Sequence, residues 1–277
     1  MLFDILISVL YGIVEGITEW LPVSSTGHMI LLNSLLNFDN VSSGFFSMFE
    51  VVIQLGAILA VVVLYFGRLW PLTKDEGKVK LKKSTCRLWL KIIIACVPAA
   101  IIGVLFDDKI DELFYHPLPV ALALIIVGIL FILVENHEKG MTPKMTKVSQ
   151  ITFKTAFYIG LFQVCAAVFP GTSRSGATII GALLIGVSRK AAAEFTFFLA
   201  IPVMFGASLL KIAKFGLAFT GAELAILLVG CIVSFVVSVF IIKFLMAYIK
   251  SHDFKIFGYY RIALGIVVIL ASFIIQM

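Results

Sequence analysis

Charged residues are scarce in this 277-residue chain: Asp, Glu, Lys and Arg make up 14% of it, whereas about 25% is usual for a soluble domain. Hydrophobic residues make up 61%, and the mean hydropathy is +1.10. No polar segment between the apolar runs is long enough to form a soluble domain. The chain cannot bury so much apolar surface inside a water-facing globule, so we expect an integral membrane protein. The same composition excludes intrinsic disorder, nucleic-acid binding and a secreted disulfide scaffold.

Cysteine is rare, and its spacing carries no metal or redox signal. The four cysteines form no CxxC pair and no Cys/His pattern, and a thiol in an apolar run behaves as a small hydrophobe. We expect neither a disulfide nor a zinc site. Basic residues are absent from residues 1–22, which carry Asp4, Glu15 and Glu19. A secretory signal peptide opens with Lys or Arg, so this segment is expected to belong to the mature protein.

The apolar runs predict an all-α, polytopic membrane protein. Runs such as 125–134 and 224–242 are apolar on every side, whereas the strands of a membrane barrel alternate apolar and polar residues. The expected helices are 2–21, 25–37, 45–67, 87–106, 117–135, 152–169, 174–187, 191–212, 220–250 and 257–276. Segments 25–37 and 174–187 are too short to cross a bilayer, and each follows a proline and a cluster of hydroxyl residues. They predict two re-entrant helix-break-helix units.

Loop charge predicts the orientation. Segments 68–91, 135–154 and 243–255 are rich in Lys and Arg and are assigned to the cytoplasm, which also accounts for the net charge of +6. The acidic segment 107–112 is then a solvated turn on the outer side. Lys211 and Lys214 also fall on the outer side, against this bias. Residues 1–37 therefore enter and leave from the outer face, and residues 152–187 from the inner face.

An internal repeat agrees with this topology. Residues 12–26, GIVEGITEWLPVSST, align with residues 160–174, GLFQVCAAVFPGTSR, at an offset of 148. The alignment matches Gly12 with Gly160, Glu15 with Gln163, Pro22 with Pro170, Ser24 with Thr172 and Ser25 with Ser173. Because the copies enter from opposite faces, we expect an inverted-topology repeat, about 1–106 and about 150–276, within a single integral membrane domain, 1–277. Its site is expected near the membrane midplane, where the broken helices meet.

Glu15 and Glu19 are spaced i, i+4, which places both carboxylates on one helix face. An ionised carboxylate at the centre of an inserted helix costs about 2.5–3.5 kcal/mol, so a pair requires water, a cation partner or a metal. The plainer alternative is that both lie near the interface and extend into water. The pair also suits a divalent cation, Mg²⁺ or Ca²⁺, held against phosphate groups.

Hydroxyl residues and a histidine follow the first helix. Ser24, Ser25 and Thr26 stand where a half-helix begins, so free backbone N–H groups and the helix dipole favour an anion such as phosphate. An ordinary N-cap would also explain a serine there. It would not explain His28, which adds an acid, base or nucleophile about one turn into the helix.

The second half-helix begins with Thr172, Ser173, Arg174 and Ser175, and Thr178 follows. The guanidinium of Arg174 is always charged, and its planar fork suits bidentate phosphate binding. The alternative is a flanking arginine that obeys the positive-inside bias. We expect the acids of the first repeat and His28 to face Arg174 across one shared polar pocket.

The segments GIVEGITEWLPVSSTGHM and FPGTSRSGATI resemble the two signature motifs of the bacterial undecaprenyl-diphosphate phosphatase family, also called the bacitracin-resistance protein family. The resemblance covers essentially the whole chain. It implies hydrolysis of undecaprenyl diphosphate to undecaprenyl phosphate and inorganic phosphate, which recycles the lipid carrier for peptidoglycan synthesis. The implied location is the bacterial inner membrane, with the active site opening to the outer face. By motif position, the catalytic residues would be Glu15, Glu19, Ser25, His28 and Arg174.

The expected phosphate-binding residues are Ser24, Thr26, Thr172, Ser173, Ser175 and Thr178. Ser25 is the candidate nucleophile, with His28 or Glu19 as its base. In the alternative, His28 is the nucleophile and forms a phosphohistidine, with Glu19 orienting the ring. The sequence does not separate these two mechanisms.

A second class of function is a lipid or ion transporter or flippase, because inverted repeats with broken helices are typical of secondary transporters. A nucleophile, a base and an arginine in one place favour the enzyme, since transport does not require them. The type-2 phosphatidic acid phosphatase superfamily needs a His and an Asp shortly after its arginine, which this chain lacks. The expected partners are a polyprenyl diphosphate lipid and the bilayer. The oligomeric state is left open, a homo-oligomer included.

Overall fold

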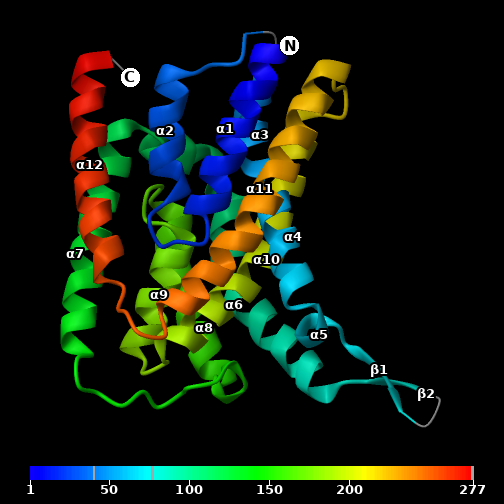
Figure 1. The fold of residues 1–277 in the computed structure, drawn as a ribbon, viewed down its shortest axis with the longest axis vertical. Coiled ribbons are helices and arrows are strands. Elements are labelled where there is room, and N and C mark those ends of the chain that lie inside the picture. Colours follow the sequence, from blue (N-terminus) through cyan, green and yellow to red (C-terminus); the bar gives the residue numbers. More distant parts are fainter. Residues whose placement is uncertain (40, 76–77, 276–277) are drawn as a thin grey trace.

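The computed structural model describes residues 1–39, 41–75 and 78–275. These residues form a helical protein with one small hairpin (Figure 1). The elements are α1 (Leu2–Thr18), α2 (Ser25–Leu35), α3 (Phe45–Val52), α4 (Gln54–Leu64), α5 (Phe66–Leu69), β1 (Leu72–Asp75), β2 (Lys78–Leu81), α6 (Lys83–Phe114), α7 (Pro117–His137), a 3-10 turn (Val148–Gln150), α8 (Phe153–Val168), α9 (Arg174–Leu184), α10 (Arg189–Phe215), α11 (Gly221–Tyr248) and α12 (Lys255–Ile275). Strand β1 pairs with β2 in antiparallel orientation.

Six segments among the described residues are long and apolar enough to cross a membrane: Phe45–Leu64, which joins α3 and α4, and helices α6, α7, α10, α11 and α12. Large apolar side chains on these helices are exposed, among them Leu122, Phe240 and Val267. Lipid is the solvent that such surfaces require. The predicted all-α, multi-pass membrane protein is confirmed. The final residue of the expected helix 257–276 lies outside the described residues.

Glycines bring helices from distant parts of the chain into close contact. A Cβ atom on Gly12 would lie 2.7 Å from a backbone oxygen of α11, and one on Gly160 would lie 2.2 Å from a backbone oxygen of α6. Helices α7 and α12 meet in the same way at Gly128 and Gly258. Small residues allow this approach in lipid, where association depends on close packing. Three tightly packed pairs result: α1 with α11, α6 with α8, and α7 with α12.

The two short helix pairs come together near the middle of the molecule. In Figure 1, α1 and α2 lie toward the end that carries both termini, whereas α8 and α9 lie toward the opposite end. Arg261 of α12 is fully buried between their connecting segments. Its guanidinium donates to the Pro22 carbonyl at 3.2 Å, and to the Gly171 and Thr172 carbonyls at 2.7 and 2.9 Å. One buried arginine therefore joins both helix breaks.

The two short helices α2 and α9 begin with the same unusual backbone conformation. Ser24 and Ser173 are the N-caps of α2 and α9, with φ of 74° and 68°, and among the described residues they alone combine a side chain with a positive φ. In backbone conformation Ser24 matches Ser173, whereas the alignment at an offset of 148 pairs Ser24 with Thr172 and Ser25 with Ser173. The second copy holds an additional residue before its helix, and Gly171 takes up the turn with φ of 94°. Ser25 and Arg174 are the first residues of these two helices.

The acidic segment 107–112 is part of a helix, contrary to prediction. Helix α6 continues through it to Phe114. Lys211 Nζ lies 2.9 Å from the Asp111 carboxylate, and Lys214 Nζ lies 2.8 and 2.7 Å from those of Asp107 and Asp108. The two lysines that break the positive-inside pattern therefore have acidic partners at the same end of the molecule. The expected helix 45–67 is also divided, into α3, α4 and α5.

Candidate active site

A cavity of about 410 Å³ lies where the two helix breaks meet. Helices α6, α8, α9 and α10 contribute to its wall, together with the end of α1 and the start of α2. Its polar side includes Glu19, Ser25, Thr26, Gln163, Ser173 and Arg174. Much of the remaining wall is small and apolar, with Ala99, Ala100, Gly103, Ala166, Ala167, Val203, Gly206 and Ala207. The cavity is thus amphipathic.

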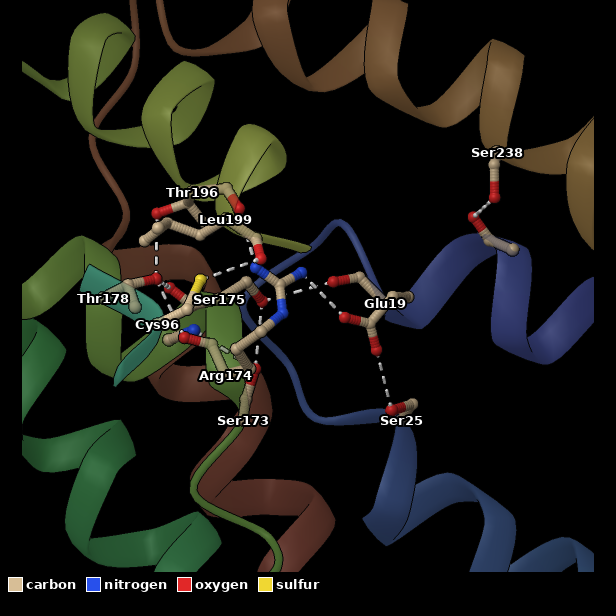
Figure 2. Close-up of polar contacts among 12 residues, drawn as sticks. Glu19, Ser25, Cys96, Ser173, Arg174, Ser175, Thr178, Thr196, Leu199 and Ser238 are labelled. Carbon is tan, nitrogen blue, oxygen red and sulfur yellow. Dashed lines mark hydrogen bonds and ion pairs between the residues drawn. The ribbon is translucent and has the colours of Figure 1, made fainter. Parts of the chain in front are cut away.

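Glu19 and Arg174 form an ion pair in this cavity. Arg174 Nη2 donates to Glu19 Oε1 at 2.9 Å, and the two side chains are 11% and 8% exposed (Figure 2). Nη1 of Arg174 donates to the Thr196 carbonyl at 2.7 Å, which ties the guanidinium to α10. Of the residues expected to face Arg174 across one pocket, Glu19 does so, whereas Glu15 and His28 are not among the residues that line the cavity. Each charge offsets the cost of burying the other.

Ser25 completes a chain of polar contacts through Glu19. Its hydroxyl donates to Glu19 Oε2 at 3.2 Å, so one carboxylate holds both Ser25 and Arg174. Figure 2 shows these three side chains converging from α2, the end of α1 and α9. A carboxylate beside a serine hydroxyl can accept its proton, and the arginine can bind an anion next to it.

The backbone at both helix starts is strained. A left-handed conformation at a residue with a side chain costs about 1–3 kcal/mol, and such residues cluster at functional sites. Ser173 Oγ accepts from the Gly176 amide and caps α9 at 3.2 Å. Ser24 makes no such bond, and its buried hydroxyl has no partner. Capping therefore explains Ser173 and does not explain Ser24.

Glu15 lies one turn before Glu19 on α1. Its side chain is 1% exposed, and neither carboxylate oxygen has a hydrogen-bond partner. A buried carboxylate without a partner is costly, because water can no longer solvate its charge. The interfacial alternative for this residue is therefore wrong in the folded protein.

His28 turns toward α12. Its Nδ1 lies 2.7 Å from the Ser24 carbonyl, and its Nε2 lies 2.7 Å from the Tyr260 hydroxyl. A carbonyl only accepts, so Nδ1 carries the proton and Nε2 accepts from Tyr260. The ring also stacks on Tyr260, with ring centroids 5.7 Å apart. Both nitrogens are thus engaged away from Ser25 and Glu19.

Four of the six predicted phosphate-binding hydroxyls lie at the cavity or are buried beside it. Thr26 and Ser173 line the cavity. Ser24 and Thr172 are buried beside it. The sequence predicted one role for all of these hydroxyls because they flank the two helix starts. The structure shows that Thr26 and Ser173 reach the cavity, whereas Ser24 and Thr172 do not.

Ser175 and Thr178 are engaged within the protein. Ser175 Oγ donates to the Glu19 carbonyl at 3.2 Å and lies 3.0 Å from Ser173 Oγ. Thr178 Oγ1 donates to the Arg174 carbonyl at 2.9 Å and lies 2.8 Å from Thr196 Oγ1. Both hydroxyls connect the start of α9 to its neighbours and hold Arg174 and Glu19 in place.

Comparison with known proteins identifies the family. Residues 8–267 match the family described as bacitracin resistance protein BacA. This chain belongs to the BacA family. It is 62% identical over 269 residues to the undecaprenyl-diphosphatase of Desulfitobacterium hafniense, covering 97% of this chain and 96% of that protein. It is 61% identical over 272 residues to undecaprenyl-diphosphatase 1 of Clostridium acetobutylicum, covering 98% of each chain.

The BacA-family site contains residues that sequence reasoning missed. Arg261 donates hydrogen bonds to both helix breaks, and no role was predicted from the sequence for this residue, which lies within an apolar helix. A charged residue inside a predicted span is a functional signal, and it could have been found on that ground. Tyr260 had no comparable signal, because its contact with His28 depends on how α12 packs against α2.

A divalent cation at this site would need carboxylate ligands beside the cavity. Among residues 1–39, 41–75 and 78–275, no group of three or more His, Cys, Asp or Glu side chains is placed to hold a metal ion. The two oxygens of Glu15 have no partner, and carboxylate oxygens suit Mg²⁺ or Ca²⁺ when phosphate and water complete the shell. The residues present therefore fit a cation that binds together with an anionic substrate.

Proposed function

We propose that this BacA-family protein is an undecaprenyl-diphosphatase, which hydrolyses undecaprenyl diphosphate to undecaprenyl phosphate and inorganic phosphate. The product is the lipid carrier of peptidoglycan synthesis. The observation that carries the proposal is the contact of Ser25 and Arg174 with one carboxylate, Glu19, in an amphipathic cavity. Relatives that match almost the full chain bear the same enzyme name.

The diphosphate binds at the polar side of the cavity. Arg174 supplies a fixed positive charge, and the start of α2 supplies backbone N–H groups that the Ser24 side chain does not cap. Thr26 and Ser173 add hydroxyl donors from the cavity wall. Phosphoryl transfer depends mainly on positioning and charge stabilisation, which this arrangement provides.

Ser25 Oγ attacks the terminal phosphorus atom, and its proton passes to Glu19 Oε2, which is 3.2 Å away. The bond from that phosphorus to the bridging oxygen breaks, and undecaprenyl phosphate leaves. The leaving undecaprenyl phosphate takes the proton from Glu19, which becomes a carboxylate again. Glu19 then accepts a proton from water, whose oxygen attacks the phosphoserine. The bond from phosphorus to Ser25 Oγ breaks, Glu19 returns its proton to Ser25 Oγ, and inorganic phosphate leaves. The alternative nucleophile, His28, would first have to exchange its bond with Tyr260.

The prenyl chain lies along the apolar wall between α6 and α10. Gly103 and Gly206 line this wall, and a Cβ atom on either would meet nothing within 4 Å. Packing does not require these glycines, although each costs a helix about 0.5–1 kcal/mol relative to alanine. We attribute them to the space that a substrate chain needs.

Glu15 and Glu19 are the residues that would hold a divalent cation, Mg²⁺ or Ca²⁺, when the diphosphate is bound. The cation would offset the negative charge of the substrate near these acids. Glu15 is assigned to this role because its oxygens are buried without partners.

The proposed topology is an inverted repeat with two re-entrant units, residues about 1–106 and about 150–276. Its support is the equivalent packing of α1 against α11 and of α8 against α6, together with the shared backbone at Ser24 and Ser173. The basic hairpin β1–β2 lies at the end opposite the termini (Figure 1), and Asp107 of the acidic end lines the cavity. The cavity is therefore proposed to open to the outer face.

The test is phosphate release from undecaprenyl diphosphate by the protein purified in detergent. The wild type and Glu112→Gln, which alters an exposed acid outside the cavity, should release phosphate at equal rates. Arg174→Ala should lower kcat/KM by at least about 100-fold, since it removes the charge that binds the diphosphate. Transport of the lipid in vesicles without phosphate release would favour the transporter instead.

A further inference from the structure

Gln163 of α8 is a buried amide that bonds to nothing in the protein. Its side chain is 2% exposed, and neither Oε1 nor Nε2 has a hydrogen-bond partner. The same residue lines the cavity that contains Glu19, Ser25 and Arg174. It is therefore a polar group without a partner on the wall of the candidate active site.

An unsatisfied amide is unfavourable in a folded protein. Native structures leave few buried polar groups unpaired, because each loses its hydrogen bonds to water on burial. A leucine has a similar volume and would avoid this cost. The amide therefore has a partner at some stage of function, and the cavity is where that partner enters.

The repeat gives this position a counterpart. Gly12 and Gly160 occupy equivalent positions in their helix pairs, and three residues later Glu15 matches Gln163. Both side chains are buried with no hydrogen-bond partner. One repeat thus places a carboxylate at this position and the other a neutral amide. An amide N–H can donate to an anionic phosphate, whereas a carboxylate only accepts.

We propose that Gln163 is a substrate-binding residue whose side-chain N–H donates to a phosphate oxygen of the bound diphosphate. This inference rests on the proposed function and assigns one further contact within it. Gln163 binds from α8, whereas Arg174 binds from α9 and Ser25 from α2. The diphosphate is then held from both halves of the repeat.

The experiment compares Gln163→Leu and Gln163→Glu with the wild type and with Cys165→Ala, an exposed control on α8 that does not line the cavity. Gln163→Leu should lower kcat/KM for undecaprenyl diphosphate by about 10- to 100-fold, the value of a hydrogen bond to a charged group. Its thermal midpoint in detergent should equal or exceed that of the wild type, because a buried unpaired amide is removed. Gln163→Glu should be less active still, because its carboxylate repels the phosphates.

A binding measurement separates contact from indirect effects. In a Ser25→Ala background, Gln163→Leu should weaken binding of undecaprenyl diphosphate by a similar factor. If Gln163 contacts the terminal phosphate, the inhibition constant of inorganic phosphate also rises, and if it contacts the proximal one, that of undecaprenyl phosphate rises. Either result supports the inference.

Three outcomes can be told apart. If the wild type releases no phosphate, the proposed function fails. If the wild type is active and Gln163→Leu has the same kcat/KM, the function stands and the role of Gln163 is wrong. A Gln163→Leu protein that loses activity together with a lowered thermal midpoint shows a structural amide, which also overturns the inference.

Discussion

Arg174 Nη2 donates to Glu19 Oε1 across 2.9 Å, although 155 residues separate the two in the chain. The pair joins the end of α1 to the start of α9, and Ser25 reaches the other oxygen of the same carboxylate. In the proposed mechanism, the incoming diphosphate competes with Glu19 for the guanidinium. Substrate binding would then free Glu19 from Arg174 and leave it beside Ser25, where the mechanism needs a base.

Glu19→Gln tests the carboxylate as a base. The amide retains a carbonyl that can accept from Arg174, but it cannot take the proton of Ser25. We expect kcat to fall by about 10²–10⁴-fold, the usual contribution of a general base. The measurement is phosphate release, with circular dichroism in detergent to show that the variant is folded. A folded variant with at least half the wild-type kcat would remove Glu19 from the mechanism.

The nucleophile is tested by trapping the covalent intermediate. With substrate labelled at the terminal phosphate, we expect label on Ser25, where a phosphoserine survives acid, and no label in Ser25→Ala. Because both ring nitrogens of His28 are engaged, His28→Gln should still become labelled, at a lower rate. Label that is lost in acid and depends on His28 would instead establish the phosphohistidine mechanism.

Arg261→Met tests whether the hydrogen bonds of Arg261 to the two helix breaks stabilise the protein. The change leaves the Pro22, Gly171 and Thr172 carbonyls without their charged donor. Hydrogen bonds to charged groups contribute about 1.5–3 kcal/mol, so we expect a clear fall in the thermal midpoint in detergent and a loss of activity. Arg68→Met, which alters a half-exposed arginine, should lower the midpoint less. Equal thermal midpoints for Arg261→Met and the wild type would show that these hydrogen bonds do not stabilise the protein.

Gly206→Leu tests the path of the prenyl chain. A Cβ atom on Gly206 would meet nothing within 4 Å in the protein without substrate. We expect kcat/KM to fall at least about 10-fold for the undecaprenyl substrate, because one overlapping side chain costs about 1–3 kcal/mol, and to fall less for a short prenyl diphosphate. The control is Gly221→Leu, at the start of α11, where a Cβ atom also meets nothing within 4 Å but the residue does not line the cavity. A loss of the same size for both substrates would place the chain elsewhere.

Local pattern predicted much of this protein. Scarce charge and long apolar runs indicated a multi-pass helical membrane protein, because a bilayer admits few other structures. Prolines and hydroxyl clusters indicated the two helix starts, which the structure places at Ser25 and Arg174. The repeat also predicted that an acid of the first half meets Arg174, since two broken helices have their polar ends at one place.

Tertiary packing decided what local pattern leaves open. Ser24 and Ser173 share a left-handed backbone conformation, although the sequence alignment does not pair them. The second segment has one more residue before its helix, and Gly171 adopts a positive φ there. Alignment by residue type does not detect these backbone conformations. His28 contacts Tyr260, and Arg261 donates to the carbonyls at both helix breaks. Both contacts depend on α12, which is far from the first motif in sequence and packs beside it only in the folded protein. The composition of the whole chain determines that this is a membrane protein, and the local spacing of residues determines where its helices form. Which buried groups meet depends on packing across the whole chain, and only the folded structure decides it.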